Sequence, residues 1–147
     1  FPEVRLKRYL EMRGADAGSK PMLVALSAFW VGLLYDQTAL EAAWDVAKSW
    51  TQEEREMLRR DTPKAALDTS IRRLKLHDIA KEVLKIATYG LERRALANAK
   101  GQNETLHLEP LTDILARGKT QADHLIDLFM KDWKRDVTPV FDYARYR

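Results

Sequence analysis

Apolar and charged residues alternate along residues 4–14, the first patterned stretch of the chain. A period of two is typical of a β-strand, because successive side chains of a strand point to opposite faces. The even-numbered face is mostly apolar. The odd-numbered face is polar and carries Arg5, Lys7, Tyr9, Glu11 and Arg13. The pattern therefore predicts one strand, on which several cations surround a single carboxylate.

Helical periodicity dominates the rest of the chain. A nearly all-apolar helix is predicted over residues 22–35, and capping boxes at Thr38 and Thr51 predict two short amphipathic helices. The dipeptide Thr62-Pro63 is expected to interrupt the pattern. The longest predicted helix runs from Leu76 toward residue 99, with Gly90 as a weak point inside it. Short helices are expected over residues 110–118 and 120–133, and a last turn begins at residue 139.

These elements define an α+β chain that is mostly helical, with one strand at its front. A length of 147 residues and an apolar content of 46% suffice for one domain with a real core. A lone strand is not stable in water by itself. The strand over residues 4–14 is therefore expected to join a sheet, and the chain is expected to be part of a longer protein.

Charge and cysteine content narrow the classes of protein. The net charge is only +3 and no long Lys/Arg block is present, so binding to nucleic acid is weakly supported. The chain has no cysteine, which excludes disulfides and thiolate metal sites and favours a reducing, cytoplasmic location. The most apolar run, residues 22–35, is shorter than a membrane span, so no membrane partner is expected.

The odd-numbered strand face is the best candidate for chemistry. Glu11 and Arg13 are two residues apart and point the same way, so a carboxylate that can hold a hard cation lies beside a guanidinium that can grip phosphate oxygens. From the pattern alone, a solvated face with an ordinary Glu–Arg pair is the more common meaning. The three histidines lack metal-ligand spacing, and the four tryptophans are expected to pack between helices.

Four stretches together resemble a known family. They are "FPEVRLKRYLEMRGAD" at residues 1–16, "AFWVGLLYD" at residues 28–36, "KSWTQEERE" at residues 48–56 and "TPVFDYARY" at residues 138–146. In this order they look like the C-terminal third of the plant and proteobacterial type of glutamate–cysteine ligase, and the match spans the whole chain. Residues 1–147 would then be the C-terminal portion of a larger ligase domain.

The resemblance implies a fold like that of glutamine synthetase, in which the face of a curved antiparallel sheet holds ATP, magnesium and glutamate. The implied reaction joins the side-chain carboxylate of L-glutamate to L-cysteine through an acyl phosphate, giving γ-glutamylcysteine, the first step of glutathione biosynthesis. In that superfamily a strand ending in Glu-x-Arg supplies a magnesium ligand and a phosphate-facing arginine. By motif these are Glu11 for the metal and Arg13 for catalysis and nucleotide binding.

Arg5, Lys7 and Tyr9 share that face and are expected to line the ATP or the acidic substrate, by geometry rather than by motif. The other carboxylates of the family lie outside this chain, so the remainder of the same polypeptide is an expected partner. The chain alone is expected to be inactive.

The chain departs from the family at two places. Residues 17–22 read "AGSKPM" where the family has Gly-Gly-Pro-Trp-Arg-Arg, and Val24 stands where plant members have a cysteine. Disulfide-based redox control is therefore not expected through this segment. The sequence leaves open which amine is accepted and how many copies assemble. An alternative is a non-catalytic helical binding or regulatory domain whose strand pairs with the sheet edge of a partner.

Overall fold

The computed structural model describes residues 3–145. Its longer helices are α1 (Lys20–Leu34), α2 (Gln37–Ala47), α3 (Gln52–Ala65), α4 (Leu76–Arg94), α5 (Glu109–Arg117), α6 (Gln121–Asp127) and α7 (Val140–Tyr143). Its strands are β1 (Val4–Leu6), β2 (Leu10–Met12), β3 (Ser70–Ile71) and β4 (Leu74–Lys75), and they form two antiparallel pairs. Short 3-10 helices cover Ala66–Asp68 and Glu104–Leu108, and a π-helical turn covers Leu128–Asp132. The α+β, mostly helical class predicted from the sequence is confirmed.

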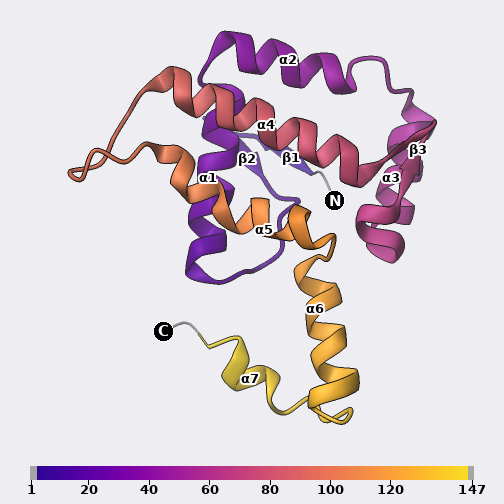
Figure 1. The fold of residues 1–147 in the computed structure, drawn as a ribbon. Coiled ribbons are helices and arrows are strands. Elements are labelled where there is room, and N and C mark those ends of the chain that lie inside the picture. Colours follow the sequence, from indigo (N-terminus) through magenta and orange to yellow (C-terminus); the bar gives the residue numbers. More distant parts are fainter. Residues whose placement is uncertain (1–2, 146–147) are drawn as a thin grey trace.

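Helices α1 and α4 lie against each other at the centre of the molecule (Figure 1). Helix α2 runs alongside α4, and α5 packs on α1 and α4 (Figure 1). The buried core comes from these four helices and the turn before α5: Ala28, Leu33, Ala39, Leu84, Ile86, Ala87, Leu91, Leu108 and Leu115. The all-apolar pattern of residues 22–35 is thus explained, because α1 has neighbours on several sides.

The two central helices touch backbone to backbone at a pair of glycines. A Cβ atom on Gly90 would lie 1.8 Å from the carbonyl oxygen of Gly32, and a Cβ on Gly32 would lie 2.2 Å from the carbonyl oxygen of Ala87. No side chain fits in that space. Gly90, expected to weaken α4, instead permits its closest contact with α1.

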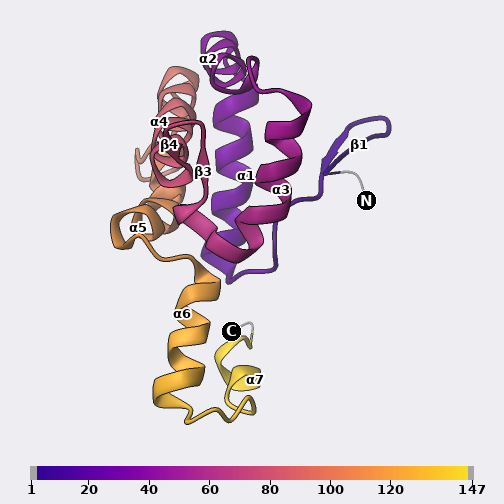
Figure 2. The same cartoon turned by 90° about the vertical axis from the view of Figure 1, so that its right-hand side faces the viewer.

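The single strand predicted over residues 4–14 is instead a β-hairpin, in which β1 and β2 pair with each other. The chain bends at residues 7–9, where the amide of Lys7 donates to the carbonyl of Tyr9 at 2.9 Å. The bend lets each strand satisfy backbone groups of the other. Because "KRY" contains no Gly, Pro, Asn or Asp, the sequence gives no turn signal there. In Figure 2 the hairpin projects from the helical body on the far side of α3 from α1.

Three helix boundaries also differ from the sequence-based expectations. Helix α2 is capped by Asp36, whose side chain accepts from the amide of Ala39, rather than by Thr38. Helix α3 continues through Pro63, which lies in its last turn and removes one hydrogen bond to the preceding turn. Helix α4 ends at Arg94, where Ala95 turns into the left-handed region. The capping box at Thr51 is confirmed.

The last two helices form an arm that extends from the core (Figures 1 and 2). A capping box at Thr120 opens α6, at the start of the helix predicted over residues 120–133. Helix α7 folds back so that Tyr143 contacts Trp133 and His124. Trp133 therefore packs as expected, whereas Trp44 on α2 is 60% exposed. No single helix within residues 3–145 is long and apolar enough to cross a bilayer. Only α1 and α2 together have that length and composition, and they are bent by 95°.

Candidate functional site

The β1–β2 hairpin brings the predicted polar residues together. Residues directly opposite each other are Val4 and Met12, Arg5 and Glu11, and Leu6 and Leu10, so odd-numbered residues face odd-numbered ones. Paired residues of two antiparallel strands place their side chains on the same face of the sheet. The odd-numbered residues therefore still share one polar face, although the chain forms a hairpin. Two short strands, rather than one long strand, carry it.

Glu11 is the centre of this cationic cluster, which we define as Arg5, Lys7, Glu11 and Arg13. Arg5 Nε donates to Glu11 Oε2 at 2.7 Å, and Arg13 Nε lies 3.8 Å from the same oxygen. Lys7 Nζ lies 3.8 Å from Glu11 Oε1. Three cations thus lie within ion-pair distance of one carboxylate, and the cluster keeps two positive charges in excess.

The same contacts fix the charge state of Glu11. The hydrogen bond from Arg5 is the main reason that the pKa of Glu11 lies below its ordinary value, with the charges of Arg5 and Arg13 acting in the same direction. Glu11 is therefore ionised at neutral pH. A charged carboxylate at this place holds together cations that would otherwise repel one another.

Tyr9 and Arg8 lie at the bend. Lys7 Nζ is 5.8 Å from the ring centroid of Tyr9, within the range of a cation–π contact. Tyr9 thus borders the cluster, as predicted. Arg8 was expected on the opposite face of a strand, but it lies exposed in the bend itself.

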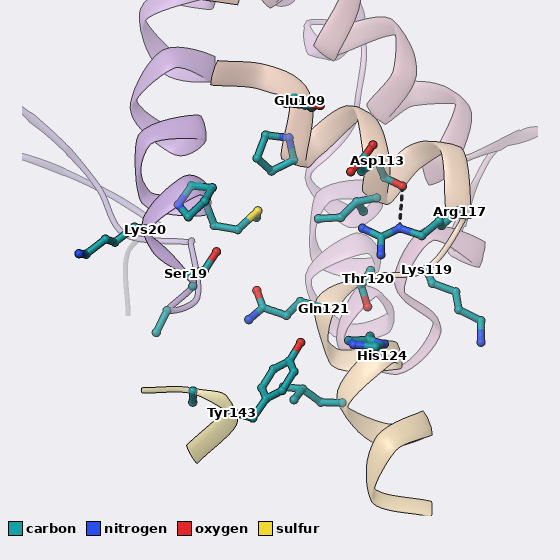
Figure 3. Close-up of a pocket in the computed structure, with 18 of the residues that line it drawn as sticks. Ser19, Lys20, Glu109, Asp113, Arg117, Lys119, Thr120, Gln121, His124 and Tyr143 are labelled. Atoms are coloured by element: carbon teal, nitrogen blue, oxygen red, sulfur yellow. Dashed lines mark hydrogen bonds between the residues drawn. The ribbon is translucent and has the colours of Figure 1, made fainter. Parts of the chain in front are cut away.

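A separate cavity of about 850 Å³ lies between the start of α1, helices α5 and α6, and α7 (Figure 3). Its polar lining includes Ser19, Asp113, Arg117, Gln121, His124 and Tyr143. Gln121 extends toward Ser19, whereas Lys20 points away. Arg117 folds back on α5, where its Nε donates to the carbonyl of Asp113 at 3.1 Å. Carboxylates and cations are mixed around the cavity, so no single charge sign dominates it.

Sequence reasoning missed this cavity. One wall is the 17–22 segment, whose sequence departs from the family pattern. Another wall comes from Glu109, Asp113 and Arg117, which recur every four residues and therefore share one face of α5. The spacing of four residues predicts a shared polar face on α5. It does not predict that α6 and α7 lie opposite that face and enclose a cavity.

Within residues 3–145, no group of three His, Cys, Asp or Glu side chains is placed to hold a metal ion. His77 Nε2 lies 2.7 Å from the carbonyl of Leu115 and joins α4 to α5, and His124 lies beside Tyr143. Each of these two histidines thus contacts another part of the fold. Glu11, predicted as a magnesium ligand, is the one carboxylate of the cationic cluster.

Three cations on one carboxylate leave this face with an excess of positive charge, and such charge favours carboxylates and phosphates as ligands. The sequence model of the glutamate–cysteine ligase family 2 matches residues 1–142. The chain belongs to this family.

Plant enzymes are among the relatives. The chain is 48% identical to glutamate–cysteine ligase, chloroplastic, of Nicotiana tabacum, 47% identical to glutamate–cysteine ligase A, chloroplastic, of Oryza sativa subsp. indica, and 47% identical to glutamate–cysteine ligase, chloroplastic, of Arabidopsis thaliana. Each match covers 99% of this chain but only 27 or 28% of the relative. The chain thus spans about a quarter of the length of these ligases.

The expected location requires correction. A chain without cysteine was expected in the cytoplasm, but these relatives are named chloroplastic. The expectation is therefore wrong. Absence of cysteine excludes disulfides from this chain, but it does not distinguish one reducing compartment from another.

Proposed function

We propose that this chain supplies one wall of the ATP site of a glutamate–cysteine ligase. In the proposed reaction the side-chain carboxylate of glutamate attacks the γ-phosphorus of ATP and ADP leaves. The amine of cysteine then attacks the carbonyl carbon of the acyl phosphate, and phosphate leaves as the amide forms. The observation that carries the proposal is the convergence of Arg5, Lys7 and Arg13 on Glu11 in a member of this family.

The cationic cluster suits the charge of this reaction. Phosphoryl transfer needs positioning and neutralisation of negative charge more than it needs covalent help from the protein. Arg13 can present a planar fork to two phosphate oxygens, whereas Lys7 acts as a compact point charge. The two excess positive charges attract a polyphosphate. Glu11 holds the cations together before the polyphosphate binds.

The residues of this chain do not by themselves fit a magnesium ion. Magnesium takes six oxygen ligands, usually one or two carboxylates together with waters and substrate phosphates. The one carboxylate of the cluster is already paired with three cations, and Arg5 donates to it at 2.7 Å. Any magnesium bound near Glu11 would need further oxygen ligands from ATP or from the larger ligase. We assign to Glu11 the organisation of the cations, and its role as a metal ligand stays a prediction.

The hairpin also needs the rest of the ligase. Its even-numbered face exposes Val4, Leu6 and Leu10, with Leu6 80% accessible. In the part of the chain that the structure describes, the outer edges of β1 and β2 bond to no other strand. A two-stranded hairpin is marginal in water. We therefore expect further strands of the ligase to extend it into the predicted sheet, with the apolar face covered and the cationic face open to ATP.

The relatives' names favour glutamate and cysteine as the substrates and a plastid as the compartment. An assay of the full-length ligase that couples ADP release to an optical signal, run with glutamate and a panel of amines, tests the reaction. Activity with cysteine is expected. A protein that releases no ADP with glutamate and any of the amines would contradict the proposed function.

The proposed face is tested by Glu11→Gln and Arg13→Lys in the full-length ligase. Glu11→Gln keeps the size of the side chain and removes its negative charge. Arg13→Lys keeps the positive charge and removes the planar guanidinium that can donate to two phosphate oxygens. Each is expected to lower kcat on the order of 100-fold, as for loss of one transition-state donor. Arg8→Gln, which removes a cation from the bend of the same hairpin, is the matched control and should leave kcat nearly unchanged. Normal turnover of Glu11→Gln, or equal damage by Arg8→Gln, would refute this face.

A further inference from the structure

An ion pair joins the β1–β2 hairpin to the helical body. Arg59 Nε, on α3, lies 3.4 Å from Glu3 Oε1, just before β1. Both side chains are about 60% exposed, so the pair can contribute little to the stability of the fold. Figure 2 shows α3 as the helix between the hairpin and α1. The pair therefore links the hairpin directly to α3.

Glu3 in turn is coupled to the cationic cluster through the backbone. Its carbonyl oxygen accepts a hydrogen bond from the amide of Arg13 at 2.9 Å, which extends the ladder of the hairpin by one pair. The neighbouring Gly14 leaves room for the Glu3 carboxylate, since a Cβ there would lie 3.2 Å from Glu3 Oε2. A shift of Glu3 would thus be transmitted directly to Arg13.

Helix α3 is itself anchored at its other end. Arg72, in the bend between β3 and β4, donates to both carboxylate oxygens of Glu54 at 2.7 and 2.9 Å. It also donates to the carbonyl of Ser49 at 2.7 Å. Glu54 belongs to the capping box that opens α3. These bonds join the start of α3 to the turn between β3 and β4, which directly precedes α4. Arg59 therefore lies on a helix whose position relative to the core is fixed.

We propose that Arg59 is a positioning residue for the nucleotide face: through Glu3, it sets the placement of the hairpin against the helical body. This inference rests on the proposed function. Arg59 touches neither ATP nor the reacting atoms in this scheme. Its effect comes from geometry, because displacement of a catalytic group by about 1 Å can cost 100-fold in rate.

The test uses the full-length ligase with four changes at this pair. Arg59→Gln removes the charge, Arg59→Lys keeps it, Arg59→Glu reverses it, and Glu3→Arg combined with Arg59→Glu reverses both charges. Arg55→Gln is the matched control, because Arg55 lies one turn earlier on α3, is exposed, and has no partner among the described residues. Initial rates give kcat and KM, and thermal melting checks the fold.

We expect Arg59→Gln to lower kcat about tenfold, with KM for glutamate and the melting temperature nearly unchanged. Arg59→Lys should retain most of the activity, and the reversed pair should be faster than Arg59→Glu alone. If Arg59→Gln matches Arg55→Gln, or if the reversed pair is no better than Arg59→Glu, the positioning role is wrong. Should Glu11→Gln lose activity in the same experiments, the proposed function stands independently of that result.

Discussion

Replacing Gly90 by Ala tests the contact on which the core is built. In an exposed helix this change is stabilising, by up to about 1 kcal/mol, because Gly loses more backbone freedom on folding. Here the new methyl group would lie 1.8 Å from the carbonyl oxygen of Gly32 and 3.0 Å from the Cβ of Ala39. The first of these atoms belongs to the backbone of α1 and cannot rotate away.

The size of the effect follows from this distance. Restoring ordinary contact at 3.4 Å requires α1 and α4 to separate by about 1.6 Å. Forcing an extra methyl group into a packed core costs about 1–3 kcal/mol or more. The separation also loosens Leu33 and Leu91, which are buried beside the crossing. After subtraction of the gain in helix propensity, we expect a net loss of about 2 kcal/mol in the free energy of unfolding.

Urea unfolding followed by circular dichroism measures this loss. The midpoint should fall with little change in slope, and Glu82→Ala, an exposed position on α4, should stay within about 0.5 kcal/mol of the parent. Gly32→Ala should act like Gly90→Ala, and the double variant should lose less than the two separate losses together, because one separation of the helices relieves both clashes. A Gly90→Ala protein as stable as the parent would show that the two backbones do not touch.

Three further predictions concern ion pairs and ligands. The hydrogen bond from Arg72 holds the pKa of Glu54 below its ordinary value. Arg72→Ala should therefore raise the pKa of Glu54 and lower the urea midpoint. An unchanged pKa of Glu54 in an NMR titration would contradict the role of this hydrogen bond. Hydrogen bonds from Lys119 and Lys131 lower the pKa of Asp127 to about 2. Their stabilisation should be complete above about pH 4 and lost as the pH falls through 2, and removing either lysine should raise the pKa. The 147-residue chain alone should bind ATP weakly with or without magnesium, because its one carboxylate near the cluster is already paired with three cations and is not free to hold the metal. Tight, magnesium-dependent binding in calorimetry would disprove this.

The helices were the most predictable part of the fold, because their signals are local. The capping box at Thr51 and the apolar periodicity from Leu76 onward placed α3 and the start of α4 correctly. What failed depended on contacts between distant residues. Gly90 was judged by its intrinsic propensity, although Gly32, 58 residues earlier in the chain, is what requires it.

The sequence predicted which residues share the candidate face, but not the hairpin that brings them together. Alternation with a period of two correctly placed Arg5, Glu11 and Arg13 on one face, since a hairpin that pairs odd-numbered residues keeps the same parity. The bend at residues 7–9 carries no turn-forming residue, so nothing in the sequence distinguished one strand from two. The cavity between α1, α5, α6 and α7 was invisible because it depends on how the arm folds back.

Stability and proposed activity are separated in this molecule. The buried side chains come mainly from α1, α2, α4 and α5, whereas the cationic cluster lies on a hairpin whose apolar residues remain exposed. A hairpin held by so little burial is free to adjust to a ligand, but it can place Arg13 accurately only if something outside it fixes its position. The Arg59–Glu3 pair is one such constraint, and covering of the apolar face by the larger ligase would be another. Since the pair is exposed and screened by salt, it can align the hairpin but cannot hold it alone. The larger ligase must therefore provide the binding energy, and Arg59 the alignment.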